Sequence, residues 1–325
     1  MQTYLADLIQ LVATQTTLIV LLMTPVIVIV RNLYRCKRRQ MRKTHVPFLR
    51  TALRPPGESL RVRLEAIHEK REEEVGNTLV YPLLIAAAVG SNPAMHTRLI
   101  VALGLAVSVG LAWYRGRILW KMMDEEHRVR LDFEGQRAVG EVLNQLMRVG
   151  YEVFHDLPFD GFNVDHVIVG RAGVFAIATR TRRKSVDEVN GRQHRVRYDG
   201  TSLQWPGGVF DTDTISLARR NSATVCRWLT SATGTRTPVQ AVIAVPGWWV
   251  DVSCRGEEIV LNESMVWREF SHLENLRLSE EQARLVTQQL RERCRLRPSQ
   301  ESPVPGSRNS KPHGVRGRRS VESVR

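Results

Sequence analysis

Two short apolar runs separated by a glycine-containing turn constrain the fold of this chain more than any other stretch. The first run covers residues 163–170 and the second covers residues 174–180. Both have strand length, are rich in β-branched residues, and flank the turn Arg171-Ala172-Gly173, which is typical of a β-hairpin. The first run carries an acid, Asp165, among residues that otherwise predict burial. We therefore predict two paired strands with a candidate functional acid in the first.

Helical and strand-like segments surround this hairpin. Residues 133–148 have apolar side chains at helical spacing, and Ser279 with Gln282 forms a capping-box pattern that opens a helix to about residue 294. Further expected elements are strands at 151–156 and 239–245 and a helix at 216–228. This order predicts an α/β fold with a mixed sheet flanked by helices.

Five pieces between about residues 131 and 270 together resemble the nuclease-related domain (NERD) family, a branch of the PD-(D/E)XK nuclease-like fold. They are Gly140-Glu141 within the helix, residues 151–157, Val164-Asp165-His166, residues 173–177, and residues 239–247. The resemblance implies a restriction-endonuclease-like core.

The same resemblance assigns roles to four positions. Glu141 matches the helix acid and Asp165 the central metal ligand, whereas Ala178 stands where a second acidic ligand is expected and Arg180 where a catalytic Lys is expected. Mg²⁺ prefers carboxylate, phosphate and water oxygens, so Ala178 offers it nothing. Arg180 can hold a phosphate but stays protonated and is a poor proton acceptor. The resemblance therefore implies a degenerate catalytic site that holds Mg²⁺ weakly or not at all, and it leaves open whether the chain is an enzyme.

The residues themselves allow other interpretations. Asp165 could be a structural acid that pairs with His166 or an Arg, and Glu141 could be a solvated helix residue. Asp187 or Glu188, downstream of the hairpin, could supply the missing carboxylate.

A basic segment follows the hairpin and suggests contacts with nucleic acid. In a nuclease-like fold its side chains would lie near the cleft and track a phosphate backbone. Tyr198 and Trp205 follow and could stack on bases. The alternative is an exposed basic hairpin in which Trp205 covers the core. The candidate nucleic-acid-binding residues are Arg180, Arg182, Arg183, Lys184 and Arg195.

The formal net charge of +14 does not reside in this domain. Residues 131–290 hold 18 Lys and Arg against 20 Asp and Glu, whereas residues 31–43 hold seven basic residues and no acid. Residues 291–325 hold ten basic residues against three acids. Such segments bind anionic lipid or nucleic acid without specificity. Four scattered Cys without a C-x-x-C pair fit a reducing compartment.

Apolar segments in the first third of the chain predict membrane anchoring. Residues 8–30 carry no charge and are long enough to cross a bilayer, and the basic run that follows places the amino terminus outside. Residues 76–95 and 98–113 predict two further crossings, which return the main domain to the cytoplasm. The alternative for residues 76–89 is a re-entrant or surface segment.

These patterns divide the chain into six parts and favour one function. We predict a membrane-anchored cytoplasmic NERD-like protein, in the inner membrane of a bacterium, that binds DNA or RNA through a degenerate nuclease site. The alternatives are an active Mg²⁺-dependent nuclease with a rearranged site and a membrane-associated scaffold for an unidentified protein partner. The parts are an anchor at 1–30, a basic connector at 31–75, a transmembrane hairpin at 76–114, a linker helix at 115–130, the domain at 131–298 and a disordered basic tail at 299–325.

Overall fold

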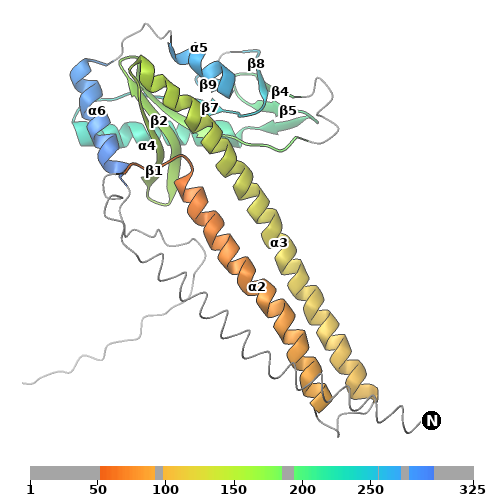
Figure 1. The fold of residues 1–325 in the computed structure, drawn as a ribbon. Coiled ribbons are helices and arrows are strands. Elements are labelled where there is room, and N and C mark those ends of the chain that lie inside the picture. Colours follow the sequence, from red (N-terminus) through yellow and green to blue (C-terminus); the bar gives the residue numbers. More distant parts are fainter. Residues whose placement is uncertain (1–51, 92–97, 185–193, 255, 272–277, 296–325) are drawn as a thin grey trace, which may run out of the picture.

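A rod of two long helices projects from a domain built on two β-sheets (Figure 1). The computed structural model describes residues 52–91, 98–184, 194–254, 256–271 and 278–295. The predicted anchor at 8–30, the basic run at 31–43 and the predicted tail at 299–325 lie outside the described residues.

The larger sheet has five strands in the order β1-β2-β3-β7-β9. They are β1 (Glu152–Phe159), β2 (Phe162–Gly170), β3 (Gly173–Thr179), β7 (Val239–Ala244) and β9 (Ile259–Leu261). The first three pair antiparallel, and β7 and β9 add in parallel to β3. The predicted hairpin and the predicted mixed sheet are therefore both confirmed.

Helices cover both faces of the larger sheet, which explains why its strands are continuously apolar. The carboxyl-terminal part of α3 (Arg98–Gln145) and α5 (Val266–Ser271) pack on one face with Phe175 and Ile177. On the other face, α4 (Asp213–Thr233) and α6 (Glu280–Arg293) pack against the intervening strand residues. The predicted capping box is present at the start of α6. Two short 3-10 helices, η3 (Leu146–Val149) and η5 (Glu263–Met265), complete the domain.

A second, four-stranded sheet has the order β6-β5-β4-β8. Its strands are β4 (Arg195–Tyr198), β5 (Leu203–Trp205), β6 (Val209–Asp211) and β8 (Trp249–Val252). The inner side chains of this sheet pack with residues of α4 and β7 in one apolar cluster. Figure 1 shows β4, β5 and β8 at the opposite end of the domain from α6.

The rod consists of α2 (Glu58–Ser91) and α3, which are antiparallel neighbours in Figure 1. Ion pairs join the two helices along their length: Arg63 to Glu125 at 2.8 Å, His68 and Arg71 to Glu126, and Arg115 to Glu74 at 2.5 Å. The last part of the predicted connector at 31–75 therefore belongs to α2, which ion pairs hold against α3.

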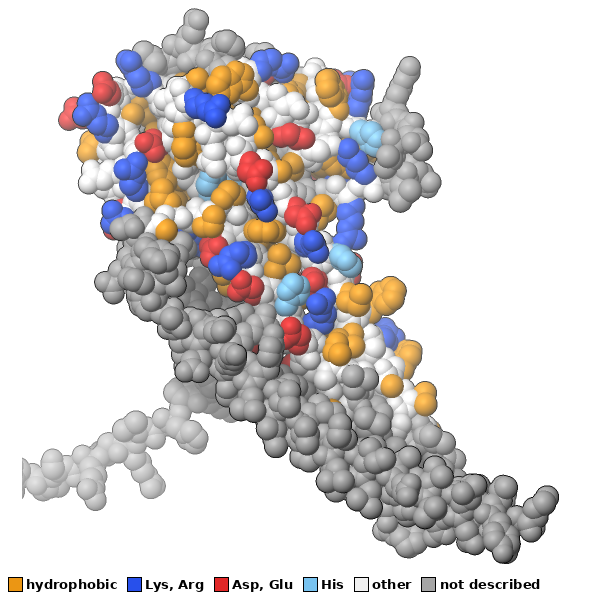
Figure 2. Space-filling view, in the orientation of Figure 1, with side chains coloured by type: hydrophobic (Ala, Val, Ile, Leu, Met, Phe, Trp, Pro, Cys, Tyr) orange, Lys and Arg blue, Asp and Glu red, His pale blue; other side chains and the backbone are white. Residues whose placement is uncertain are grey.

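The predicted crossings at 76–95 and 98–113 coincide with the distal ends of α2 and α3. Among the described residues, no helix is both long enough and apolar enough to span a membrane. The membrane crossings are therefore not supported. Several large apolar side chains of α3 are nevertheless exposed, and Figure 2 shows hydrophobic side chains gathered along this part of the rod: Leu103, Val107, Val109, Trp113, Tyr114, Trp120 and Met123.

Candidate functional site

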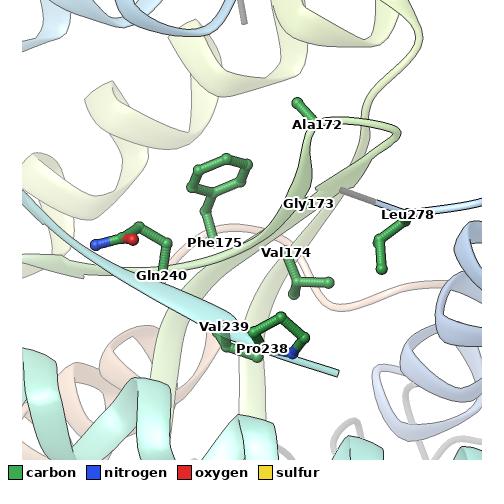
Figure 3. A pocket seen from close by; sticks show the side chains of 8 residues that line it. All are labelled: Ala172, Gly173, Val174, Phe175, Pro238, Val239, Gln240 and Leu278. Carbon is green, nitrogen blue, oxygen red and sulfur yellow. The ribbon is translucent and has the colours of Figure 1, made fainter. Parts of the chain in front are cut away.

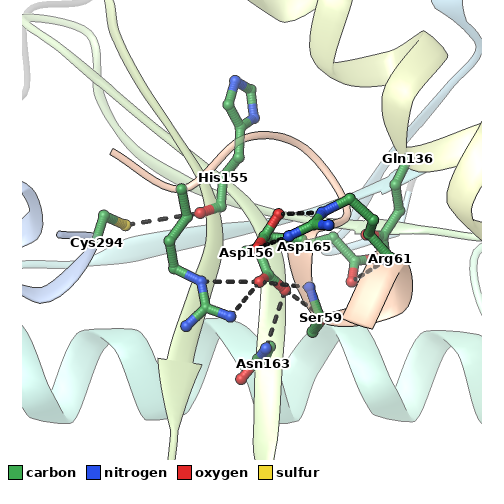
Figure 4. Close-up of polar contacts among 10 residues, drawn as sticks. Ser59, Arg61, Gln136, His155, Asp156, Asn163, Asp165 and Cys294 are labelled. Atoms are coloured by element: carbon green, nitrogen blue, oxygen red, sulfur yellow. Dashed lines mark hydrogen bonds and ion pairs between the residues drawn. The ribbon is translucent and has the colours of Figure 1, made fainter. Parts of the chain in front are cut away.

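The regular alternation of β2 breaks at Asp165. Val164 and Val167 contact the same core cluster although they are three residues apart. The register pairs His155 with His166 and Leu157 with Val164, and between these pairs lies Asp156, whose φ of 50° is left-handed. Asp156 on β1 and Asp165 on β2 both lie between these two pairs, at the distorted position of the two strands (Figure 4).

Two donors occupy the carboxylate of Asp165. The amide Nε2 of Gln136 on α3 donates to Oδ1 at 2.7 Å, and the backbone N–H of Thr179 at the end of β3 donates to Oδ2 at 2.7 Å. Burial raises the pKa of Asp165 from its ordinary value to about 7, against the opposing effect of the Thr179 hydrogen bond, and the charges of Asp156 and Asp132 raise it further. The proton affinity of this acid is therefore far from that of an exposed Asp.

Two more oxygens belong to the residues that hold Asp165. Gln136 Oε1 and Thr179 Oγ1 are buried and have no hydrogen-bond partner. Asp132, one helical turn before Gln136, accepts a short hydrogen bond from Thr181. Both groups that hydrogen-bond to the Asp165 carboxylate are thus nitrogen donors, and each of the two residues also carries a buried oxygen without a partner.

Glu141, the predicted helix acid, does not face Asp165. Its side chain is 63% exposed and pairs with Arg137 at 3.0 Å. The buried apolar residues Val139 and Leu143 set the phase of α3, and Gln136 lies three and seven residues before them, on the same side. In the sequence, the helical spacing of the apolar residues Val139 and Leu143 therefore indicates that Gln136, rather than Glu141, faces the sheet.

Two glycines let α3 approach the sheet closely. A Cβ on Gly135 would collide with Thr181 Cγ2, and a Cβ on Gly140 would stand 2.6 Å from Pro56 Cγ and 3.4 Å from His155 Cε1. The helix therefore reaches Asp165 with a side chain as short as Gln136.

Ala178 and Arg180 occupy different surroundings. Ala178 is buried in the apolar cluster beneath the smaller sheet, so this position presents only a methyl group. Arg180 Nε donates to Asp211 Oδ2 at 3.1 Å. Burial acts to raise the pKa of Asp211, but hydrogen bonds from Thr214 and the charge of Arg180 hold that pKa below its usual value. Arg180 therefore ties β3 to the start of α4.

The exposed basic segment after β3 begins three residues beyond Thr179, the residue whose N–H donates to Asp165. Arg182, Arg183 and Lys184 are exposed. The guanidinium of Arg182 lies 5.2 Å from the centre of the Trp205 ring, and Lys184 Nζ lies 5.4 Å from that of Trp248. These contacts orient cations beside the site.

The base-stacking role predicted for Tyr198 and Trp205 is wrong. Both side chains are buried, and Trp205 packs edge-on against Trp248 with ring centres 5.1 Å apart. The alternative, in which Trp205 covers the core, is the observed arrangement. Arg195 is exposed on β4, apart from the segment 182–184 in the chain.

Asp156 has a different set of partners, which the sequence did not reveal. It is 1% exposed and accepts hydrogen bonds from Arg54 Nε at 2.9 Å, from both the backbone and the hydroxyl of Ser59 at 2.9 and 2.5 Å, and from Asn163 Nδ2 at 2.9 Å. Arg54 Nη2 adds an ion pair at 2.6 Å. Figure 4 shows Ser59 and Asn163 pointing toward Asp156. This acid fastens the start of α2 to the sheet.

A buried histidine pair lies beside the two aspartates. His155 Nδ1 and His166 Nδ1 are 2.9 Å apart, and His155 Nε2 is 3.0 Å from Asn144 Oδ1. Burial lowers the pKa of His155 to about 4 and that of His166 well below its usual value. Both rings are therefore neutral at pH 7, so the interpretation of Asp165 as an ion-pair partner of His166 is not supported by this geometry.

As folded, the described residues do not fit a Mg²⁺ site of the expected kind. No group of three or more His, Cys, Asp or Glu side chains in the described part of the chain could hold a metal ion. Asp187 and Glu188, the proposed replacements for the missing carboxylate, lie outside the described residues. A small pocket of about 70 Å³ lies elsewhere, at the amino end of β3 and β7 (Figure 3), and Asp165 does not line it.

Comparison with known proteins agrees with this architecture. Residues 131–246 match the family model of the nuclease-related domain, NERD, which spans the carboxyl-terminal part of α3 to the end of β7. This part of the chain is therefore similar to the nuclease-related domain. No curated protein and no solved structure gives a significant match.

Proposed function

We propose that this protein binds nucleic acid through its NERD domain and does not cleave it efficiently. One observation carries the proposal: the exposed cations at 182–184 begin three residues after Thr179, whose N–H donates to Asp165. A phosphate backbone that contacts these cations would pass beside Asp165, which the family resemblance assigns as the central metal ligand.

The surroundings of Asp165 argue against efficient turnover. Each oxygen of the carboxylate already accepts one hydrogen bond from a nitrogen donor, which leaves fewer lone pairs for a metal ion, and Ala178 offers no second acid. A pKa of about 7 leaves Asp165 partly protonated at neutral pH, which weakens it further as a metal ligand. We therefore expect this domain to bind nucleic acid without cleaving it efficiently.

The binding proposal is tested with a triple variant, Arg182→Gln/Arg183→Gln/Lys184→Gln. We expect its affinity for a labelled oligonucleotide to fall at least tenfold at about 0.1 M salt, with a shallower salt dependence because fewer counterions are released. The control is Arg227→Gln, which removes an exposed charge from α4. Equal affinity of the triple variant and the control would refute the proposal and favour a scaffold role.

A second candidate, Mg²⁺-dependent cleavage, has one observation in its favour. The unpartnered oxygens of Gln136 and Thr179 would join Asp165 in an all-oxygen ligand set if the Gln136 amide turned over. The test is cleavage of single- and double-stranded substrates with Mg²⁺ or Mn²⁺, with Asp165→Ala as control. Cleavage that Asp165→Ala abolishes would establish the nuclease, and its absence at high protein concentration would leave binding as the function.

We propose a membrane-adjacent location on the basis of the uncharged segment 8–30, the basic run 31–43 and the exposed apolar side chains of α3, among them Leu103 and Trp113. The basic run favours a cytoplasmic domain in a bacterial inner membrane. Alkaline extraction of isolated membranes tests this location. Recovery of the full chain in the supernatant would refute an integral anchor.

A further inference from the structure

The outer face of the smaller sheet carries an arrangement that neither the sequence patterns nor the family match assigns. Side chains alternate along its strands, so Val196 and Val250 point inward while their neighbours are exposed. The register pairs Arg195 with Trp249, Arg197 with Asp251 and with Gln204, and Gln204 with Phe210. Six side chains therefore share one face: Arg195, Arg197, Gln204, Phe210, Trp249 and Asp251.

Two large aromatic rings on this outer face are open to solvent. Trp249 is 62% exposed and Phe210 is 64% exposed, whereas Trp248, the residue before Trp249, is buried. Phe210 on β6 and Trp249 on β8 are three strand spacings apart, about 14 Å. The rings are too far apart to cover each other, so each offers a separate stacking surface.

Arginines lie between the two rings. Arg195 is the direct cross-strand neighbour of Trp249, and Arg197 stands two residues further along the same strand. Arg197 Nε donates to Ser253 Oγ at 2.8 Å, which orients the side chain and does not involve its two terminal NH₂ groups. Asp251 is the one acid among the six residues of the face. Asp199, just after β4, adds a second acid at the edge of this face and accepts a hydrogen bond from Gln204 Nε2 at 2.9 Å. The positive charge of the face is therefore concentrated at Arg195, beside the Trp249 ring.

We infer that the outer face of the smaller sheet binds single-stranded nucleic acid, with bases on Trp249 and Phe210 and phosphates on Arg195 and Arg197. Exposed rings stack on bases only where these are unpaired, and the arginines complement a polyanion. The inference rests on the proposed nucleic-acid binding and specifies its strand state and its surface.

The test is fluorescence anisotropy of the full chain with labelled oligo(dT), oligo(U) and a duplex of equal length. For Trp249→Ala we expect single-strand affinity to fall roughly 5- to 150-fold, and Phe210→Ala should act in the same direction. Duplex affinity should change less than twofold. Arg195→Gln/Arg197→Gln should lower the slope of log affinity against log salt by about 1.4 for the single strand.

Matched variants keep the interpretation clear. Trp267→Ala removes an exposed tryptophan from α5, and Arg227→Gln removes an exposed arginine from α4. Both should bind like the unmodified chain. Thermal unfolding checks that Trp249→Ala remains folded, which is expected for an exposed ring. If Trp249→Ala is unfolded, two other variants replace it. Trp249→Phe, which keeps a stacking ring, should retain most of the affinity, and Trp249→Leu should not.

The outcomes separate this inference from the proposed function. One outcome would refute the inference and keep the proposed function. In it, Trp249→Ala binds single strands as well as Trp267→Ala does, while the triple variant at 182–184 loses affinity. An equal loss on single strands and duplex would overturn the single-strand assignment. A full chain that binds none of the probes would overturn both.

Discussion

Asp156 and Asp165 are the same residue type on neighbouring strands, and they have opposite surroundings. Asp156 receives a cation, Arg54, together with hydroxyl, amide and backbone donors. Asp165 receives only two neutral donors, so burial raises its pKa to about 7. The charge of Asp156 is balanced by Arg54, so this acid has a structural role. Asp165 has only neutral donors and a raised pKa, which is typical of an acid at a functional site.

Replacing Asp156 should have the largest effect on the stability of the fold. Asp156→Ala leaves Arg54 and Ser59 without their acceptor, and we expect the free energy of unfolding to fall by about 3–5 kcal/mol. Urea unfolding followed by circular dichroism measures the loss. Asp160→Ala, at an exposed position of the turn after β1, is the control and should change stability by less than about 0.5 kcal/mol. Equal effects at the two positions would show that the Asp156 contacts do not stabilise the fold.

Asp165 should act through pH instead. Its folded-state pKa of about 7 lies above its unfolded value, so the folded protein binds the proton more tightly and stability falls as pH rises from about 4 to 7. Asp165→Asn removes this dependence, because an amide does not titrate in this range. Asn can still accept from Thr179 and, with the Gln136 amide turned over, donate to Gln136 Oε1. Relative to the unmodified chain, the variant should gain about 2–4 kcal/mol between pH 4 and pH 7. A stability difference that does not vary with pH would contradict the raised pKa.

The neighbouring histidines should oppose this trend. Burial lowers the pKa of both rings below the unfolded value, so their contribution is present above pH 6.5 and is lost as pH falls towards 4. In His166→Leu the loss of stability between pH 6.5 and pH 5 should be about 2 kcal/mol smaller than in the unmodified chain. The measurement is a series of urea unfolding curves at half-unit pH steps. An unchanged slope would mean that His166 is not the buried neutral group described here.

The smallest effect comes from giving Asp165 a second acid. Gln136→Glu places a carboxylate where the amide now donates, and the pair should bind Mn²⁺. We expect millimolar Mn²⁺ to stabilise this variant by about 1 kcal/mol and to leave the unmodified chain unaffected. Glu141→Gln, which alters the exposed helix acid, is the matched control and should show no response to Mn²⁺. A response only in the unmodified chain would instead support the Mg²⁺-dependent nuclease.

Local patterns were enough to predict most of the domain. The β2–β3 hairpin, the strand β7 and the capping box of α6 follow from short apolar runs rich in β-branched residues, turn chemistry and capping residues. The continuity of α3 from Arg98 to Gln145 was not predicted, because three segments of different composition share one helix. The smaller sheet was also missed, since its strands are only three or four residues long.

The sequence by itself determined that Asp165 lies in a buried strand and that Ala178 provides no ligand, since both facts depend on residue type and local period. Only the tertiary structure decided the rest of the site. The rotation of α3 about its axis, fixed by packing of Val139 and Leu143 on the sheet, brings Gln136 rather than Glu141 to Asp165. The pairing of Asp156 with Arg54, 102 residues away, likewise depends on how the chain folds back on itself. Long-range packing sets which charges meet, and no local pattern records it.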